Sequence, residues 1–254
     1  MKNILALIEN KQQIYARLPL FEFLNDTTIE PSKRLAFAPC ATPFIMGFSD
    51  LCKYSLRQEP SNDKVQIILN RHTYEDDFHW QWFVSDLAKL GFNGSLSFNS
   101  AIAFLWSEQT KVSRLITHEL HSLIIDATAI ERLIIMEAME STADVLLSNT
   151  KLVSEELKLM THQEYDYFGS SHCDAEHEHN TNSQGAREFM RNIQIPEQQR
   201  EHCAYLVERV FELFTQWTHE LLNYAQNYRA TQPLEQQLKP NYASSSEELA
   251  LQPV

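Results

Sequence analysis

The stretch "RHTYEDDFHWQWF", residues 71–83, combines acids and histidines with aromatic residues. In a helix, residues three and four apart share a face, so His79 would neighbour Glu75 and Asp76. An imidazole and a carboxylate one turn apart can converge on one metal ion. His72 would lie two turns before His79 on the same side, as a spare ligand. The alternative is an ordinary solvated helix face.

A second stretch, "SSHCDAEHEHN", is richer in histidine. His172, Glu176 and His179 follow the spacing i, i+4, i+7, which places one oxygen and two nitrogen donors on a single stripe. Asp174 and His177 form a second possible pair. A purely surface role is the alternative, because few apolar residues occur among these positions.

A site for two metal ions also needs bridging carboxylates, and "IERLIIMEAMESTAD" offers Glu137 and Glu140. Glu137 falls on the same helical stripe as Leu133 and Ile134, so its side chain is expected to face the interior. A carboxylate among isoleucines is costly unless it is paired or bound to a metal. An arginine or tyrosine partner would satisfy it equally well.

The elements that position these residues are predicted to be helices, because only five glycines occur in 254 residues and turn signals are scarce. Pro39 and Pro43 should kink or divide the helix that Pro31 opens, and Ser61 or Asn62 could cap the next one. The expected helices cover about 3–17, 31–56, 63–90, 99–122, 127–148 and 197–229, with an uncertain break at 148–150 and the histidine-rich segment within 160–192.

Composition limits the classes of function. The formal net charge of −13 argues against nucleic acid as a partner and weakly against anionic membranes. Four widely spaced cysteines fit a reducing compartment better than a disulfide framework. The pattern of residues at the N-terminus predicts an amphipathic helix rather than a signal peptide, and no apolar run is long enough to span a membrane. A cytoplasmic protein with a helical domain at 1–230 and a loose polar tail at 231–254 is expected.

Three segments carry a resemblance to a known family: "LPLFEFLNDTTIEPSKRLAFAPCATPFIMGFSDL", "NRHTYEDDFHWQWFVSDLAKLG" and "YFGSSHCDAEHEH". The chain resembles the haem-oxygenase-like superfamily, which includes TenA-type thiaminases, the pyrroloquinoline-quinone synthesis proteins and haem-oxygenase-like diiron oxidases. The first segment resembles the family's opening helices, the second its acid-then-histidine helix, and the third the Tyr-Phe…His-x3-Asp-x2-His signature of the diiron oxidases. The resemblance covers residues 18 to about 230 and implies an all-α, compact bundle of about seven helices.

The resemblance also implies ligands for two iron ions. His79 would match the first histidine ligand, with Glu75 or Asp76 as its acidic partner. The middle carboxylate would be Glu137, with Glu140 as the alternative. The last three ligands would be His172, Glu176 and His179, with His177 as an alternative to His179. Glu176 stands where the family usually has Asp, and the spacing from Phe168 to His172 is longer than in the family.

The implied function is a non-haem diiron oxidase or oxygenase that acts with O₂ on a small organic substrate, usually as a homodimer. Two alternatives stay open. One is a metal-free TenA-like enzyme that acts on a small molecule, although the cysteines lack the matching glutamate and tyrosine pattern. The other is a binding or regulatory protein with the same bundle and no catalysis. Phe78, Trp80, Trp82 and Phe83 could wall a substrate pocket or form part of the core.

Overall fold

The computed structural model describes residues 1–178 and 184–228, except for the side chains of 175–178 and 184–187. These residues form helices and no strand, which confirms the all-helical prediction. The helices are α1 (Lys2–Tyr15), α2 (Pro19–Asn25), α3 (Pro31–Arg34), α4 (Ala38–Leu51), α5 (Lys64–Asp76), α6 (Trp80–Lys89), α7 (Phe98–Leu105), α8 (Lys111–Ile124), α9 (Ala129–Thr161), α10 (Ser170–Glu178), α11 (Gln184–Asn192) and α12 (Glu197–Asn227); a π-helical turn (Cys52–Leu56) follows α4 and a 3-10 turn (Glu108–Thr110) precedes α8.

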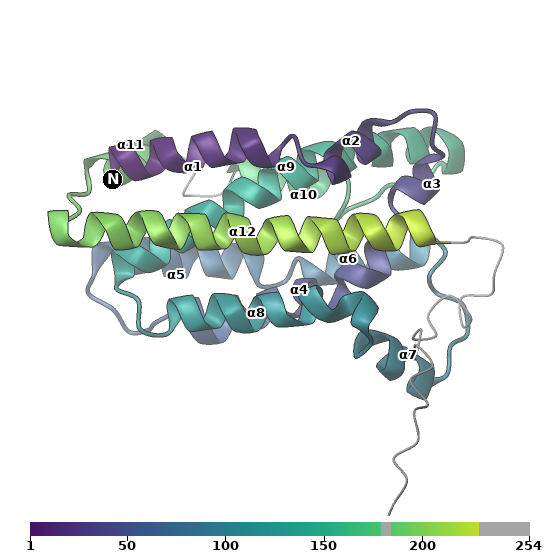
Figure 1. Cartoon of the computed structure of the whole chain (residues 1–254), viewed down its shortest axis with the longest axis horizontal. Helices are drawn as coiled ribbons and strands as arrows, with labels where there is room; N and C mark the ends of the chain where they lie inside the picture. Colours follow the sequence, from purple (N-terminus) through teal and green to yellow (C-terminus); the bar gives the residue numbers. More distant parts are fainter. Residues whose placement is uncertain (179–183, 229–254) are drawn as a thin grey trace, which may run out of the picture.

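The two longest helices, α9 and α12, pack against each other and organise the bundle. Figure 1 shows α12 crossing the front of the molecule, with α1 and α2 along one edge and α8 along the other. α1 packs against both long helices, and α4, α8 and α12 contact one another. α5 and α10 both contact α9, and α6 contacts α4. This arrangement brings the two histidine-containing segments to the same long helix.

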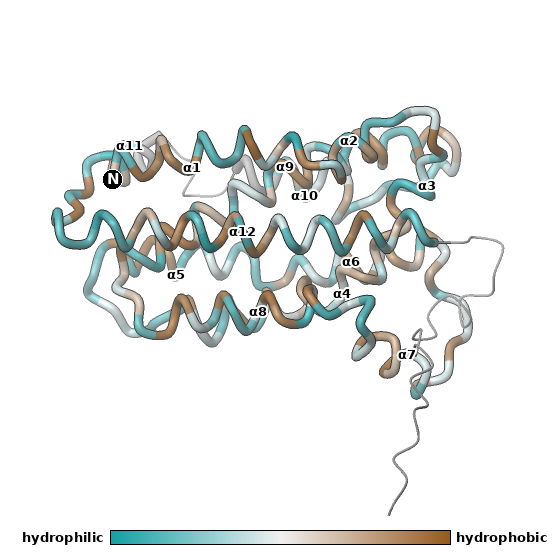
Figure 2. The backbone as a smooth tube through the Cα atoms, in the orientation of Figure 1, coloured by the Kyte–Doolittle hydropathy of each residue, from teal (hydrophilic) through white to brown (hydrophobic). Residues whose placement is uncertain are grey.

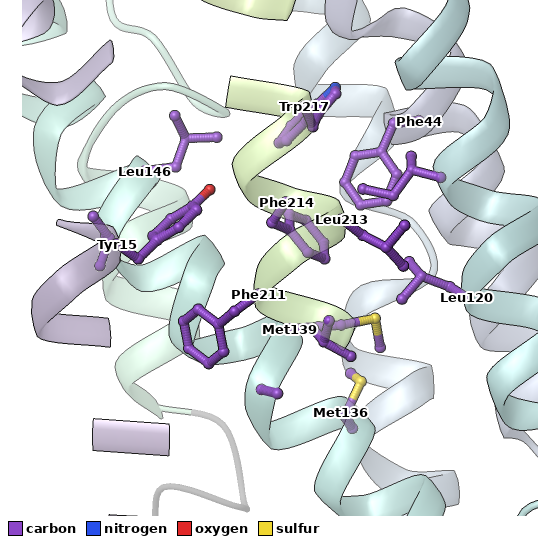
Figure 3. Close-up of a cluster of buried hydrophobic side chains, with 14 of the residues drawn as sticks. Tyr15, Phe44, Leu120, Met136, Met139, Leu146, Phe211, Leu213, Phe214 and Trp217 are labelled. Atoms are coloured by element: carbon purple, nitrogen blue, oxygen red, sulfur yellow. The ribbon is translucent and has the colours of Figure 1, made fainter. Parts of the chain in front are cut away.

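The core follows the helical spacing of the apolar residues. Hydrophobic and hydrophilic segments alternate along α8 and α12 (Figure 2), as expected for helices with one buried face. The inward-facing positions predicted for the last helix are all buried: Leu206, Val210, Phe214, Trp217 and Leu221. Figure 3 shows how side chains from α12 meet those of α1, α4, α8 and α9 in one cluster.

The helix predicted over 63–90 is divided after Asp76, and this prediction was wrong. Ser49 donates a hydrogen bond to the Asp77 carbonyl (2.6 Å), and Arg57 donates to the Thr73 carbonyl (2.8 Å) while pairing with the Asp77 carboxylate (2.7 Å). In a continuous helix, the carbonyls of Thr73 and Asp77 would accept hydrogen bonds from amides one turn later. Here they accept hydrogen bonds from side chains that are distant in sequence. The chain therefore turns, and a new helix begins after His79. Asp63, rather than Ser61 or Asn62, caps α5.

The helix predicted over 99–122 is likewise two helices, α7 and α8. Arg114 donates to the carbonyls of Leu105 (2.8 Å) and Ser107 (2.7 Å) at the end of α7. Glu220 on α12 accepts hydrogen bonds from the amides of Val112 (2.7 Å) and Ser113 (2.8 Å), so it caps α8 from another helix. The boundary therefore depends on a residue more than a hundred positions away.

No break occurs at 148–150, where α9 continues to Thr161. Asn149 and Thr150 donate their side-chain hydrogen bonds to the carbonyls of Val145 (2.7 Å) and Leu147 (3.2 Å) within the same helix. Their polar groups are therefore satisfied without leaving the helical conformation.

The helix predicted over 31–56 is divided just before Pro39, as predicted, but Pro43 does not divide it. The chain leaves the helix between α3 and α4, Pro39 lies in the first turn of α4 where no amide donor is needed, and Pro43 stays inside α4.

The four cysteines lie within the described residues; all are buried and none forms a disulfide. Among residues 1–178 and 184–228, no helix has both the length and the apolar character needed to cross a bilayer. The tail predicted at 231–254 lies outside the described residues.

Candidate metal centre

A buried triad of one histidine and two acids joins α5 to α9. His72 Nε2 lies 3.1 Å from Asp76 Oδ2 and 3.3 Å from Glu140 Oε1. His72 and Asp76 are one turn apart on α5, and Glu140 comes from α9, which packs against it. Potential ligand atoms of the three residues all lie within 4.8 Å of one another, a separation that suits donors converging on one ion.

The triad is shielded from water. His72 is 1% exposed, Asp76 is 2% exposed, and the Glu140 side chain is 21% exposed. Burial by itself lowers the pKa of His72, but the neighbouring carboxylates of Asp76 and Glu140 outweigh it and hold this pKa well above its ordinary value. Without a metal, a protonated His72 therefore offsets one of the two negative charges of the acids. A cation bound among the same donors would take over that role.

Two further histidines meet beside this triad. The rings of His79 and His172 lie 4.5 Å apart between centroids, and both side chains are buried. His172 Nδ1 lies 3.1 Å from the Tyr167 carbonyl, an arrangement in which Nδ1–H donates to that oxygen. Nε2 is then the ring nitrogen with the electron pair that a metal needs, and a carbonyl partner of this kind is usual behind a histidine ligand. Trp82 stacks on His79 at 4.7 Å.

Asp86 fixes the turn that leads into α10. It is fully buried and accepts hydrogen bonds from the amides of Asp166 (3.0 Å), Tyr167 (2.8 Å) and Phe168 (3.1 Å). Gly169 follows, and a Cβ atom there would lie 1.9 Å from the Tyr165 carbonyl oxygen. Only glycine fits such a close approach of backbone to backbone. The acid on α6 and this glycine together determine where α10 begins and so where His172 is placed.

The two groups of side chains border one cavity of about 60 Å³. Asp76, His79, Glu140, Tyr167 and His172 supply its ionisable side chains, and the remaining lining residues are mostly apolar. A mostly apolar cavity with a few ionisable donors is typical of small-molecule sites in proteins. The arrangement can hold a cation against a compound that enters the cavity.

The structure places several predicted ligands together. Asp76, His79 and His172 all line the cavity, and Glu140, predicted as the alternative to Glu137, lines it as well. Glu176 and His177 lie in α10, and the structure does not describe their side chains. His179 lies outside the described residues altogether.

For two of the open alternatives, Glu75 or Asp76 and Glu137 or Glu140, only the second residue of the pair lines the cavity. Glu75 is half-buried, whereas its neighbour Asp76 is almost wholly buried and borders the cavity. Glu137 is half-buried on α9, one turn before Glu140. Asp174 is exposed and pairs with Lys151 at 3.4 Å, which fits a surface role.

The central position of His72 was not predicted. The prediction of one continuous helix placed His72 on the same side as His79, as a spare ligand. Because the chain turns at Asp77, His72 pairs with Asp76 and Glu140, and His79 points to α10 instead. The i, i+4 spacing of His72 and Asp76 was the signal that could have identified this pair.

The aromatic residues of the first stretch divide between the two predicted roles. Trp80 lines the cavity and Phe83 is fully buried in the core, whereas Phe78 is 40% exposed.

Comparisons with known proteins add no assignment: no protein-family model matches the sequence, and no curated protein matches it significantly. Function must therefore be argued from the residues around the cavity.

Proposed function

We propose that this protein is a non-haem diiron oxidase or oxygenase that acts with O₂ on a small organic substrate, built on a haem-oxygenase-like bundle. One observation carries the proposal: imidazoles and carboxylates from α5, the turn after it, α9 and α10 meet at one end of an apolar cavity. Histidine and carboxylate donors on facing helices are the usual ligands of diiron proteins.

The histidines and carboxylates present suit the binding of two cations. Three groups with ligand atoms within 4.8 Å of one another include two carboxylates, which can bridge two cations. Their burial means that the acids need a positive partner, either a proton on His72 or a metal. His172 has the backbone carbonyl partner that orients a ligand histidine.

Each residue has a distinct task in this proposal. Iron held by histidines and carboxylates with open positions can bind and activate O₂. Asp76 and Glu140 supply negative charge where cations bind, and His79 and His172 supply neutral nitrogen donors. Tyr167, through its carbonyl, keeps His172 in one tautomer and orientation. The apolar wall keeps water away from the reacting end of the cavity.

A second candidate is a metal-free small-molecule enzyme or binding protein. The raised pKa of His72 favours it, because a protonated imidazole offsets one of the two negative charges of the acids without any metal. In that case the triad is a structural ion cluster beside a binding cavity.

Iron content distinguishes the two candidates. Protein produced in iron-rich medium, or loaded anaerobically with Fe(II), should contain about two iron ions per chain. Glu140→Gln and His172→Ala should each lose most of the iron, whereas His219→Ala, at an exposed position of α12, should retain it. Mixing the reduced protein with O₂ should change its absorbance.

Iron in the Glu140→Gln and His172→Ala proteins equal to that in the unmodified protein would overturn the metal proposal. So would the absence of iron from the unmodified protein after loading. Either result would leave the metal-free candidate. Circular dichroism of each variant checks that the helices are intact.

A further inference from the structure

The cavity wall away from the histidines is apolar on nearly every side. Phe44 and Phe48 contribute from α4, Leu146 from α9, and Phe214 and Trp217 from α12. Phe44 packs edge-on against Trp217 at 4.7 Å and against Phe214 at 5.3 Å. Figure 3 shows these three rings gathered where α12 meets α4. The wall is therefore a preformed set of aromatic and aliphatic surfaces.

The polar atoms in this wall are already engaged by the protein. The Thr142 hydroxyl donates to the Met139 carbonyl at 2.7 Å. The Ser49 hydroxyl donates to the Asp77 carbonyl and accepts from Lys53 at 2.9 Å. Trp217 donates its indole N–H to Ser113 at 2.8 Å, so it presents only its ring to the cavity. A ligand therefore finds few hydrogen-bond partners along this wall.

Ionisable side chains are few in the cavity lining. Among the described residues that line the cavity, they are Asp76, His79, Glu140, Tyr167 and His172, and no lysine or arginine is present. A carboxylate placed against the aromatic wall would lose its water without gaining a partner, and an ammonium group would regain only part of that cost from the aromatic rings, so both are unfavourable there.

We infer that the substrate is a small, uncharged and mainly apolar molecule, or the apolar end of one, with at most one polar group directed at the histidines and acids. As a statement about a substrate, this inference rests on the proposed function. The cavity of about 60 Å³ accepts roughly four to six water-sized atoms. Zwitterionic and multiply hydroxylated compounds of that size are excluded by the wall.

Two alcohols of equal size, each with six non-hydrogen atoms, test the inference on this chain. 1-Pentanol can direct its hydroxyl at the histidines and acids and its chain against the wall, whereas 1,4-butanediol forces a second hydroxyl into the apolar region. Binding is followed by tryptophan fluorescence, since Trp80 and Trp217 line the cavity. The diol is expected to bind about ten-fold more weakly, because its second hydroxyl is buried without a partner. Equal affinities would overturn the inference.

A cavity-filling variant locates the binding. Ala143 lines the cavity on α9 and is only half-buried, so Ala143→Phe should occupy the space and weaken 1-pentanol binding at least ten-fold. Ala88→Phe, at an exposed position of α6, is the matched control and should leave binding unchanged. Unchanged binding in Ala143→Phe would overturn the assignment of this cavity as the site.

Iron content measured on the same preparations separates this inference from the proposed function. Iron uptake without a preference for 1-pentanol refutes the apolar substrate class alone. A clear preference without iron uptake refutes the oxidase and shows an apolar binding cavity in a metal-free protein. If neither iron uptake nor the preference is observed, both proposals are wrong.

Discussion

Replacing Asp86 should destabilise the protein more than a typical surface mutation does, because this carboxylate holds the turn before α10. Asp86→Ala would leave three amides without their acceptor, those of Asp166 and Tyr167, which are partly buried, and that of Phe168, which is buried. Each such orphaned donor costs about 1–3 kcal/mol, and partial entry of water into the turn reduces the sum. We expect a loss of about 3–5 kcal/mol in the free energy of unfolding.

Lys89 does not add to this loss. It donates to Asp86 at 3.1 Å but also to Asp166 at 2.8 Å, so it keeps one acidic partner in the variant. Asp86→Asn should be intermediate, because one oxygen can still accept while the new amide group faces backbone donors.

Urea unfolding of chelator-treated protein, followed by circular dichroism, measures the effect without a contribution from bound metal. Asp144→Ala is the control, since this exposed acid contacts only Gln12 among the hydrogen bonds described for it (3.0 Å). It should change stability by less than about 1 kcal/mol. An Asp86→Ala protein as stable as this control would refute the role assigned to Asp86.

Two further predictions concern other positions. Gly169→Ala should lower the unfolding temperature and displace the start of α10, because the added Cβ cannot approach the Tyr165 carbonyl to 1.9 Å; an unchanged thermal transition would contradict this. Burial raises the pKa of Glu220, although the amides of Val112 and Ser113 partly oppose the shift. The folded protein thus holds this proton more tightly than the unfolded chain, so stability should fall as pH rises from the ordinary carboxyl range through the raised pKa. Glu220→Gln should lack this component when unfolding is measured across pH, and identical pH profiles would contradict it.

The helical class and the buried faces could be predicted from the sequence, because they depend on local spacing. The inward positions of α12, such as Phe214 and Trp217, follow directly from a period of 3.6 residues. The ends of helices could not be predicted equally well. The break at Asp77 depends on Ser49 and Arg57, and the start of α8 depends on Glu220, all distant in sequence.

The same limit applies to the candidate site. Asp76, His79 and His172 could be identified because residues of metal-binding type cluster there in the sequence. The partnership of His72 with Glu140 could not, since it requires the turn after α5 and the packing of α5 on α9. Which acid of a neighbouring pair faces inward is decided by helix rotation, and one residue of error in a boundary reverses the answer.

The triad of His72, Asp76 and Glu140 also sets a limit on the resistance of this bundle to heat. Removing one member of a buried ionic group typically costs about 3–5 kcal/mol, whereas replacing the whole group with apolar side chains of similar size is often neutral or stabilising by about 1–4 kcal/mol. A redesign for thermal resistance alone would therefore replace all three residues. The resulting bundle would be expected to be as stable or more stable, and its cavity would keep His79 and His172 but no carboxylate.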